Sequence, residues 1–201
     1  MTQPAPSTTI GRGAPEYDLT TSELREIVAQ GLLGVAPGAR VLAILPDKTR
    51  DDNTDLLFPI AAEFLAARQV AAFDALIAQG THVPMTEAEK LAKVGMLGGL
   101  TNVGTIYDHQ WDSPEALVKI GELSAAQVTQ LTGGLLNNAV PITLNKLVTN
   151  YDTILVFGAT VPHEVAGFAG GGKYFFPGIA GPELTHNTHW LGALVTIEKT
   201  I

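Results

Sequence analysis

The chain has 201 residues, of which 46% are hydrophobic and 16% are charged, so it can bury a substantial core and fill one large domain or two small ones. Its 12 basic and 20 acidic residues give a net charge of −8, which argues against nucleic acid or an anionic membrane as the main partner. The absence of cysteine excludes disulfides, thiolate zinc sites and cysteine nucleophiles.

The N-terminal segment, residues 1–18, is rich in Pro, Thr, Ser and Gly and predicts a flexible lead-in. It lacks the apolar centre of a signal peptide, and no later run approaches the ~20 consecutive apolar residues that span a bilayer. We therefore expect a cytoplasmic enzyme or binding protein.

The first half of the chain alternates between helical and strand patterns. TTSELREIVAQGLLG, from residue 20, has helical spacing, and RVLAIL predicts a buried strand that ends at Pro46. A helix that begins near Asn53 or Thr54 follows, and then a second strand in FDALIAQGTH and a short helix in TEAEKLAKVGML. This alternation predicts a parallel sheet with crossover helices.

The second half of the chain is less regular. TNVGTIY and ALVKI are shorter candidates, SAAQVTQLTGGLLNN fits a helix or a loop, and TILVFGATVPH predicts the clearest strand. The expected fold class is α/β, with an open, mostly parallel Rossmann-like sheet and flanking helices.

Three of the predicted strands end in polar clusters: PDKTR, QGTH and ATVPH. Ligands of open parallel sheets bind beyond the carboxyl ends of the strands, so we expect these clusters to converge on one site. In PDKTR, Arg50 offers a forked donor for a carboxylate and Asp47 can orient a neighbour, whereas the alternative is a solvated turn before a helix.

Histidines follow the second strand and the segment after it. His82, in QGTH, is either a capping or packing residue or a proton carrier, since histidine titrates near neutral pH. His109, in YDHQWD, lies among acidic and aromatic residues and is a weaker candidate for a catalytic group.

A lysine at the end of three consecutive glycines is the most unusual local feature. Gly167 to Lys173 fits the phosphate-loop pattern G-x-x-x-x-G-K, but Tyr174 stands where Ser or Thr would hold magnesium, and VPHEVA separates the loop from its strand. A structural loop remains open, with the glycines at 170–172 serving positive φ or tight packing. So does a ligand site in which Lys173 is an anion contact or a nucleophilic amine.

Three of the five histidines, His163, His186 and His189, surround this glycine loop. Imidazole suits nickel, copper, iron and zinc, and a spacing of three residues can place two rings on one helix face. The set matches no recognisable zinc motif.

Four segments lie in a fixed order: DKTR, GTHVPMT, PHEVAGFAGGGKYFFPGIAG and finally His189. Together they resemble the motifs of the nickel-dependent lactate racemase family, and the third is the most specific. The resemblance covers roughly residues 22–200 and corresponds to the N-terminal part of a longer two-domain chain. It implies that residues 19–201 form the catalytic, cofactor-binding domain.

The resemblance also implies a cofactor. Members of this family use a nickel pincer nucleotide, a pyridinium-3-thioamide-5-thiocarboxylic acid mononucleotide that carries nickel and is joined to a lysine. Lys173 matches this lysine, and His189, sixteen residues later, matches the histidine that ligates nickel. Gly171, Gly172 and Thr49 are expected to contact the cofactor.

The same resemblance assigns catalytic roles. His82 and His163 correspond to the acid and base on opposite faces of a 2-hydroxy acid, and Arg50 corresponds to the arginine that holds the substrate carboxylate. Asp47 belongs to the same substrate-binding motif. The implied reaction is racemisation or epimerisation by reversible hydride transfer, through a 2-keto acid.

The sequence departs from the family pattern in three places. The loop reads GGGK where many relatives carry a larger residue before the lysine, and Thr188 stands where relatives often carry Asn. The chain also stops soon after His189, so we expect the C-terminal domain and its substrate contacts to be missing and turnover to be slow or absent. In an isolated domain we expect no cofactor, because its loading depends on separate biosynthesis proteins.

Two other functions are compatible with the residues alone. A non-catalytic module for phosphate or nucleotides would bind an anion without needing His82 or His163. A metal-dependent hydrolase would use the histidine cluster, although Glu164 and Glu183 are the only acidic residues between positions 163 and 189.

Overall fold

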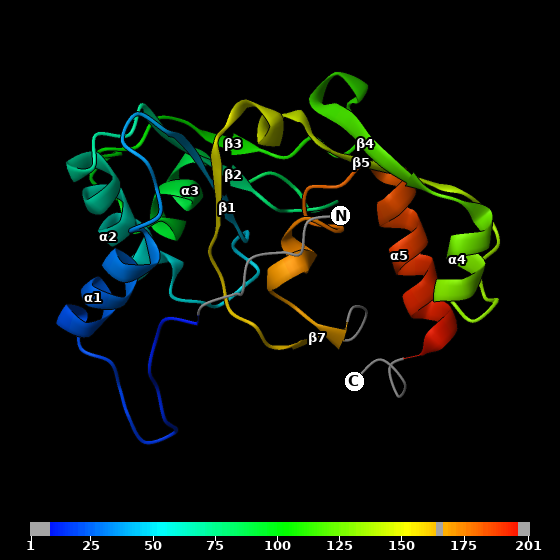
Figure 1. Ribbon diagram of the computed structural model, residues 1–201, viewed down its shortest axis with the longest axis horizontal. Helices are drawn as coiled ribbons and strands as arrows, with labels where there is room; N and C mark the ends of the chain where they lie inside the picture. Colours follow the sequence, from blue (N-terminus) through cyan, green and yellow to red (C-terminus); the bar gives the residue numbers. More distant parts are fainter. Residues whose placement is uncertain (1–8, 164–166, 197–201) are drawn as a thin grey trace.

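Figure 1 shows a computed structural model of the chain, which describes residues 9–163 and 167–196. A four-stranded, fully parallel sheet in the order β3-β2-β1-β6 lies at its centre. Its strands are β1 (Arg40–Leu45), β2 (Ala72–Ile77), β3 (Ile106–Asp108) and β6 (Thr153–Val156). The predicted α/β class with a parallel sheet is therefore confirmed.

Three of the five α-helices in the described residues begin at a side-chain cap. Thr20, Thr86 and Ser124 each form a capping box with a Glu or Gln three residues later, which satisfies backbone N–H groups of the first turn. The α-helices are α1 (Thr21–Gly31), α2 (Thr54–Ala67), α3 (Glu87–Lys93), α4 (Ala125–Leu131) and α5 (Pro182–Val195). The segment that fitted either helix or loop is thus α4 followed by a turn.

One face of the sheet packs against α1, α2 and α3. Alternate side chains of β1, such as Val41 and Leu45, join Phe73 of β2 in a core with Phe58 and Leu65 of α2. The period of two along each strand sends the intervening residues to the opposite face. Both faces of the central strands β1 and β2 are buried, which explains why these two strands read as continuous apolar runs.

The other face of the sheet packs against the second half of the chain. Leu42 and Ile44 of β1 and Leu76 of β2 contact a core that includes Leu144 and Leu184. In Figure 1 this second half lies across from α1 and α2, with α4 and α5 beside β4 and β5. Its strands and 3-10 turns are β4 (Leu117–Leu123), β5 (Val140–Asn145), β7 (Pro162–His163), β8 (Gly167–Phe168), η1 (Pro114–Ala116), η2 (Lys146–Asn150) and η3 (Gly171–Tyr174).

Strand β5 positions the start of α5. The backbone N–H of Asn145 donates to the carbonyl of Ile179 at 2.9 Å, and that of Gly181 donates to Thr143 at 3.1 Å. The sequence patterns did not single out β5 as a strand. It pairs antiparallel with β4 outside the main sheet.

No helix in the described ranges is long and apolar enough to cross a membrane. The predicted boundary after residue 18 stays a prediction, and Glu164, Val165 and Ala166 of the third motif lie outside the described residues.

Candidate active site

A cavity of about 510 Å³ opens at the carboxyl ends of β1 and β2. The loops after these strands form one side, the paired strands β7 and β8 together with η3 form another, and α5 faces them. The two strands are parallel neighbours, so the loops that follow them leave the same edge of the sheet. The expected convergence of PDKTR, QGTH and ATVPH is observed for their site residues Arg50, His82 and His163, which all line this cavity.

Asp47 follows β1 and is 4% exposed. Its Oδ1 accepts hydrogen bonds from the backbone N–H of Thr49 at 3.0 Å and from the Thr49 hydroxyl at 2.6 Å. Burial by itself raises the pKa of Asp47, but the bonds from Thr49 and His82 outweigh it and lower the pKa below the ordinary value. Asp47 is therefore an anion at neutral pH.

His82 follows β2 and contacts this anion. Its Nδ1 lies 2.6 Å from Oδ2 of Asp47, while its side chain is 49% exposed and lines the cavity. Since the carboxylate is ionised, Nδ1 is the donor, and in the neutral ring Nε2 is left as a basic nitrogen. The backbone N–H of Gly80 donates to Gly178 at 3.0 Å, which joins this loop to the end of the glycine segment.

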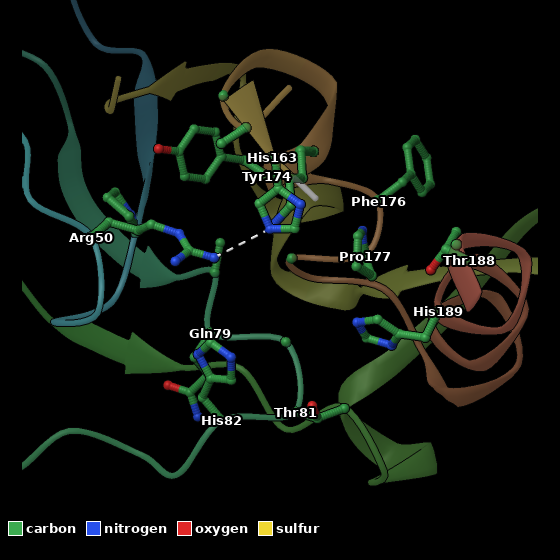
Figure 2. A pocket seen from close by; sticks show the side chains of 18 of the residues that line it. Arg50, Gln79, Thr81, His82, His163, Tyr174, Phe176, Pro177, Thr188 and His189 are labelled. Atoms are coloured by element: carbon green, nitrogen blue, oxygen red, sulfur yellow. Dashed lines mark hydrogen bonds between the residues drawn. The ribbon is translucent and has the colours of Figure 1, made fainter. Parts of the chain in front are cut away.

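His163 ends β7 and lies beside Arg50. Nη2 of Arg50 is 3.5 Å from Nε2 of His163, a contact drawn as a dashed line in Figure 2. This distance is at the long end for a hydrogen bond, so it indicates proximity rather than a strong pair. A carboxylate held by Arg50 would lie next to the His163 ring.

The glycine loop delivers Lys173 to the cavity. Gly170 has φ of 85°, and a Cβ there would lie 2.6 Å from the Thr160 hydroxyl and 2.8 Å from the carbonyl of Ala159. Glycine is required at this position for both reasons. The chain then turns through η3, where the N–H of Lys173 donates to Gly170 at 3.0 Å.

Helix α5 carries His189 on the side of the cavity across from Arg50, as Figure 2 shows. Burial, followed by the nearby charges of Lys173 and His186, lowers the pKa of His189. The neutral imidazole that results is the form that ligates metals. His186 does not line the cavity and packs edge-on against Trp111, with ring centroids 5.7 Å apart.

The cavity brings together most of the residues singled out from the sequence: Asp47, Arg50, His82, His163, Lys173 and His189. Thr49, Gly171 and Gly172 were expected to contact the cofactor, but they are not among the lining residues. Thr49 instead holds Asp47, and the two glycines form the first turn of η3.

His109, the weaker catalytic candidate, is a buried structural residue that is 1% exposed. Its Nε2 donates to the carbonyl of Ala180 at 2.9 Å, and its Nδ1 accepts from the side-chain amide of Asn145 at 3.2 Å. These bonds join the end of β3 to β5 and to the start of α5.

Several lining residues were missed by sequence reasoning. Leu191, Gly192 and Val195 share one face of α5 with Thr188, and their spacing of three, four and seven residues after it is a helical signal that could have identified them. Gln79, Tyr174 and Phe176 also line the cavity. Gln79 belongs to the QGTH cluster that was expected at the site, whereas no local pattern marks Tyr174 and Phe176, which η3 and the residues after it bring to the cavity.

The histidines do not form a metal site of their own. Within residues 9–163 and 167–196, no group of three or more His, Cys, Asp or Glu side chains is arranged to hold a metal ion. His163 and His189 line the cavity and His186 does not, so the three histidines of the alternative hydrolase are not brought to one place.

Two comparisons connect this site to known sequences. Residues 27–200 match the family described as the lactate racemase N-terminal domain. The chain is 30% identical over 141 residues to lactate racemase from Lactiplantibacillus plantarum, an alignment that covers 70% of this chain and 30% of the relative.

Solved structures give the same result for the fold. A crystal structure of a protein from Thermotoga maritima superposes with a TM-score of 0.81 and 34% identity, over 88% of this chain and 42% of that protein. The lactate racemase apoprotein from Thermoanaerobacterium thermosaccharolyticum shares the fold, with a TM-score of 0.60 and 24% identity over 78% of this chain and 37% of that one. The chain thus spans less than half the length of these relatives.

The resemblance carried by the four motifs is confirmed by a match over most of the chain. This protein belongs to the lactate racemase N-terminal domain family.

Proposed function

We propose that this chain is the cofactor-binding and acid–base part of a 2-hydroxyacid racemase or epimerase, an isomerase that uses a nickel pincer nucleotide. The observation that carries the proposal is the shared cavity of His82, His163, Arg50, Lys173 and His189. Proton carriers, a carboxylate receptor, an amine and a metal-ligating imidazole thus face one volume.

The cavity suits this cofactor in size and in chemistry. Its volume of about 510 Å³ falls among pockets that hold small ligands, which range over roughly 300–1,000 Å³. Imidazole is a favourable nickel ligand, and the pKa of His189 is lowered by burial and then by the charge of Lys173. Lys173, which lines the cavity, would anchor the cofactor covalently. When bound, the group supplies an electrophilic centre that accepts and returns hydride.

Arg50 binds the substrate carboxylate. Its guanidinium offers paired donors that match the two carboxylate oxygens, and it lies in contact with His163. The carboxylate fixes the substrate so that its carbon-bound hydroxyl lies between imidazoles from separate loops. This arrangement supports proton transfer on both faces of the reacting carbon.

His82 and His163 move the hydroxyl proton. One imidazole accepts this proton as the C–H hydrogen leaves with its electron pair, which gives a 2-keto acid. The second imidazole, in its protonated form, would donate a proton to the oxygen when hydride returned to the other face, which would give the other stereoisomer. Each histidine is expected to contribute about 10²–10⁴-fold to the rate.

Asp47 acts through His82. Both oxygens of the Asp47 carboxylate accept hydrogen bonds, Oδ1 from Thr49 and Oδ2 from His82. Asp47 therefore holds the Nδ1–H of His82 and keeps Nε2 of that ring as the proton-accepting atom. Its negative charge also stabilises the imidazolium that forms on proton uptake.

The proposal is tested on the full-length protein produced together with pincer-cofactor biosynthesis enzymes. Intact mass and nickel content should show an added group on Lys173 and bound nickel, and both should be lost in Lys173→Ala. The matched control is Lys48→Ala, because Lys48 is exposed and pairs with Glu89 outside the cavity. Retention of the added mass in Lys173→Ala, or an unmodified and metal-free wild type, would overturn the assignment.

Racemisation of L- and D-lactate by the loaded protein then tests the reaction class. His82→Asn and His163→Asn should each lower kcat with the cofactor still attached. Tight binding of phosphate or a nucleotide with no dependence on either histidine would identify a binding module instead.

A further inference from the structure

We propose that Lys93 is a positioning residue that holds the backbone of Arg50 in place for carboxylate binding. The proposal rests on the role of Arg50 in the proposed function. Lys93 lies on α3, outside the cavity, and does not touch the substrate. Its effect passes through the peptide group of Arg50.

Lys93 makes a buried contact with the loop that carries Arg50. Its Nζ donates to the carbonyl oxygen of Arg50 at 2.8 Å and to Oδ1 of Asp52 at 3.1 Å. The side chains of Lys93 and Asp52 are 9% and 2% exposed. A lysine is seldom buried to this extent unless it is paired, so the contact is a specific feature of the loop.

Asp52 depends on Lys93 for charge compensation. Its Oδ1 also accepts the backbone N–H of Thr54 at 2.9 Å, while its buried Oδ2 has no hydrogen-bond partner among the described residues. Lys93 is the cation paired with this carboxylate. Loss of Lys93 would therefore release the Arg50 carbonyl and leave a buried anion uncompensated.

Helix α3 is fixed from both ends, so it can serve as a rigid support. Its first turn begins directly after the His82 loop, at the capping box of Thr86. After its last turn, Gly95 adopts φ of 67°, and a Cβ there would collide with the backbone carbonyl of Asp55 at the start of α2. Lys93 thus belongs to α3, which packs against α2, the helix that follows the loop carrying Arg50.

The guanidinium of Arg50 must meet both a carboxylate and His163. The Arg50–His163 contact is already 3.5 Å long, so a small displacement of the Arg50 backbone removes it. Displacements of about 1 Å can cost on the order of a hundredfold in rate when they misalign a reacting group. A donor bond to the carbonyl of Arg50 itself is the shortest route by which a residue outside the cavity can control this alignment.

The test compares three variants of the full-length protein. Lys93→Met/Asp52→Asn removes the bond to Arg50 while neutralising both members of the pair, so the fold is not left with an unpaired buried charge. Asp52→Asn alone removes the negative charge beside Lys93 but keeps a side-chain oxygen acceptor and the lysine that donates to the Arg50 carbonyl, so it carries the stability cost of a broken ion pair without removing that bond. Lys48→Met removes the exposed pair with Glu89, between the same loop and the same helix.

Two readouts separate positioning from stability. The first is the NMR signal of the Arg50 Nε–H in the free protein, which needs no substrate. The second is the Kd for sodium L-lactate, followed through that signal and through KM and kcat where the loaded enzyme turns over. We expect the double variant to shift the Arg50 signal and to raise Kd and KM at least tenfold, with Asp52→Asn and Lys48→Met close to wild type.

Each outcome has a distinct meaning. If the double variant and Asp52→Asn lose unfolding stability equally and both keep the wild-type Arg50 signal and Kd, Lys93 is a structural residue only and the proposal is wrong. If wild type does not bind L-lactate and Arg50→Lys has no effect on any carboxylate, the proposed function fails. The Arg50 signal of the free protein still reports whether Lys93 sets its position.

Discussion

Nδ1 of His82 lies 2.6 Å from Oδ2 of Asp47, so a carboxylate in the loop after β1 orients an imidazole in the loop after β2. Asp47 is in turn held by Thr49, and its lowered pKa reflects bonds from both neighbours against the opposing effect of burial. A carboxylate and a histidine in this arrangement form an oriented base whose free nitrogen is Nε2.

Replacing Asp47 by Asn should lower kcat by about 10²–10⁴-fold with a smaller change in KM, because His82 loses both its fixed tautomer and its counter-ion. Steady-state racemisation kinetics measure this. Thr49→Val keeps the contact with His82 and loses one of the two bonds to Oδ1, so it should change kcat less than tenfold. A rise in KM alone for Asp47→Asn would mean that Asp47 binds substrate directly.

Replacing Arg50 by Lys should raise KM for a 2-hydroxy acid by about tenfold to a hundredfold. A hydrogen bond to a charged group contributes about 1.5–3 kcal/mol, and lysine cannot reproduce the paired donors. Initial rates over a range of lactate concentrations provide the measurement. Arg25→Lys, at an exposed pair with Glu63, is the control and should leave KM unchanged.

His109 predicts a loss of stability in mild acid. Burial is the main cause of its lowered pKa, and the bond to Ala180 and the charge of Asp112 only partly oppose it. Protonation of Nδ1 would place its N–H against the NH₂ group of the Asn145 side chain. That amide cannot flip to offer its oxygen, because the oxygen already accepts a hydrogen bond from the backbone N–H of Leu147 at 3.0 Å.

The unfolded chain therefore takes up a proton below about pH 6.5 that the folded chain resists. The stability is fully present above that pH and decreases as pH falls toward the folded-state pKa, by at most about 1.4 kcal/mol per pH unit. Urea unfolding between pH 7.5 and 5 should show this slope and a flatter one in His109→Gln. The control is His186→Gln, at an exposed position of α5, which should keep the wild-type slope. If His109→Gln also kept the wild-type slope, His109 would not be the cause of the pH dependence.

The three consecutive glycines should tolerate substitution unequally. Gly170→Ala places a side chain at φ of 85° and against Ala159 and Thr160, so it should lower the free energy of unfolding by about 2 kcal/mol or more. Gly172 has no positive φ and open space around its Cβ direction, so Gly172→Ala should change it by less than about 1 kcal/mol. Denaturant unfolding of both variants checks the contrast. If Gly172→Ala folds normally but fails to load cofactor, its predicted role in cofactor contact is supported.

The sequence by itself determined the parallel sheet and the loops that follow its strands. Continuous apolar runs such as RVLAIL can only be buried on both faces, and the carboxyl ends of parallel strands meet at one edge, so Asp47, Arg50 and His82 were expected together. The four motifs added Lys173 and His189, which the periodicity could not assign.

Only the tertiary structure decided what supports these residues. The face that α5 turns to the cavity depends on backbone bonds from β5 to the segment before it, between residues far apart in the chain. Long-range hydrogen bonds also define the roles of His109 and Lys93. His109 is a buried residue that connects three segments rather than a catalytic group, and the partners of Lys93 lie about forty positions earlier. Local patterns report burial and turns, whereas these polar contacts join segments about 34 to 71 residues apart and exist only once the helices and loops have packed on the sheet.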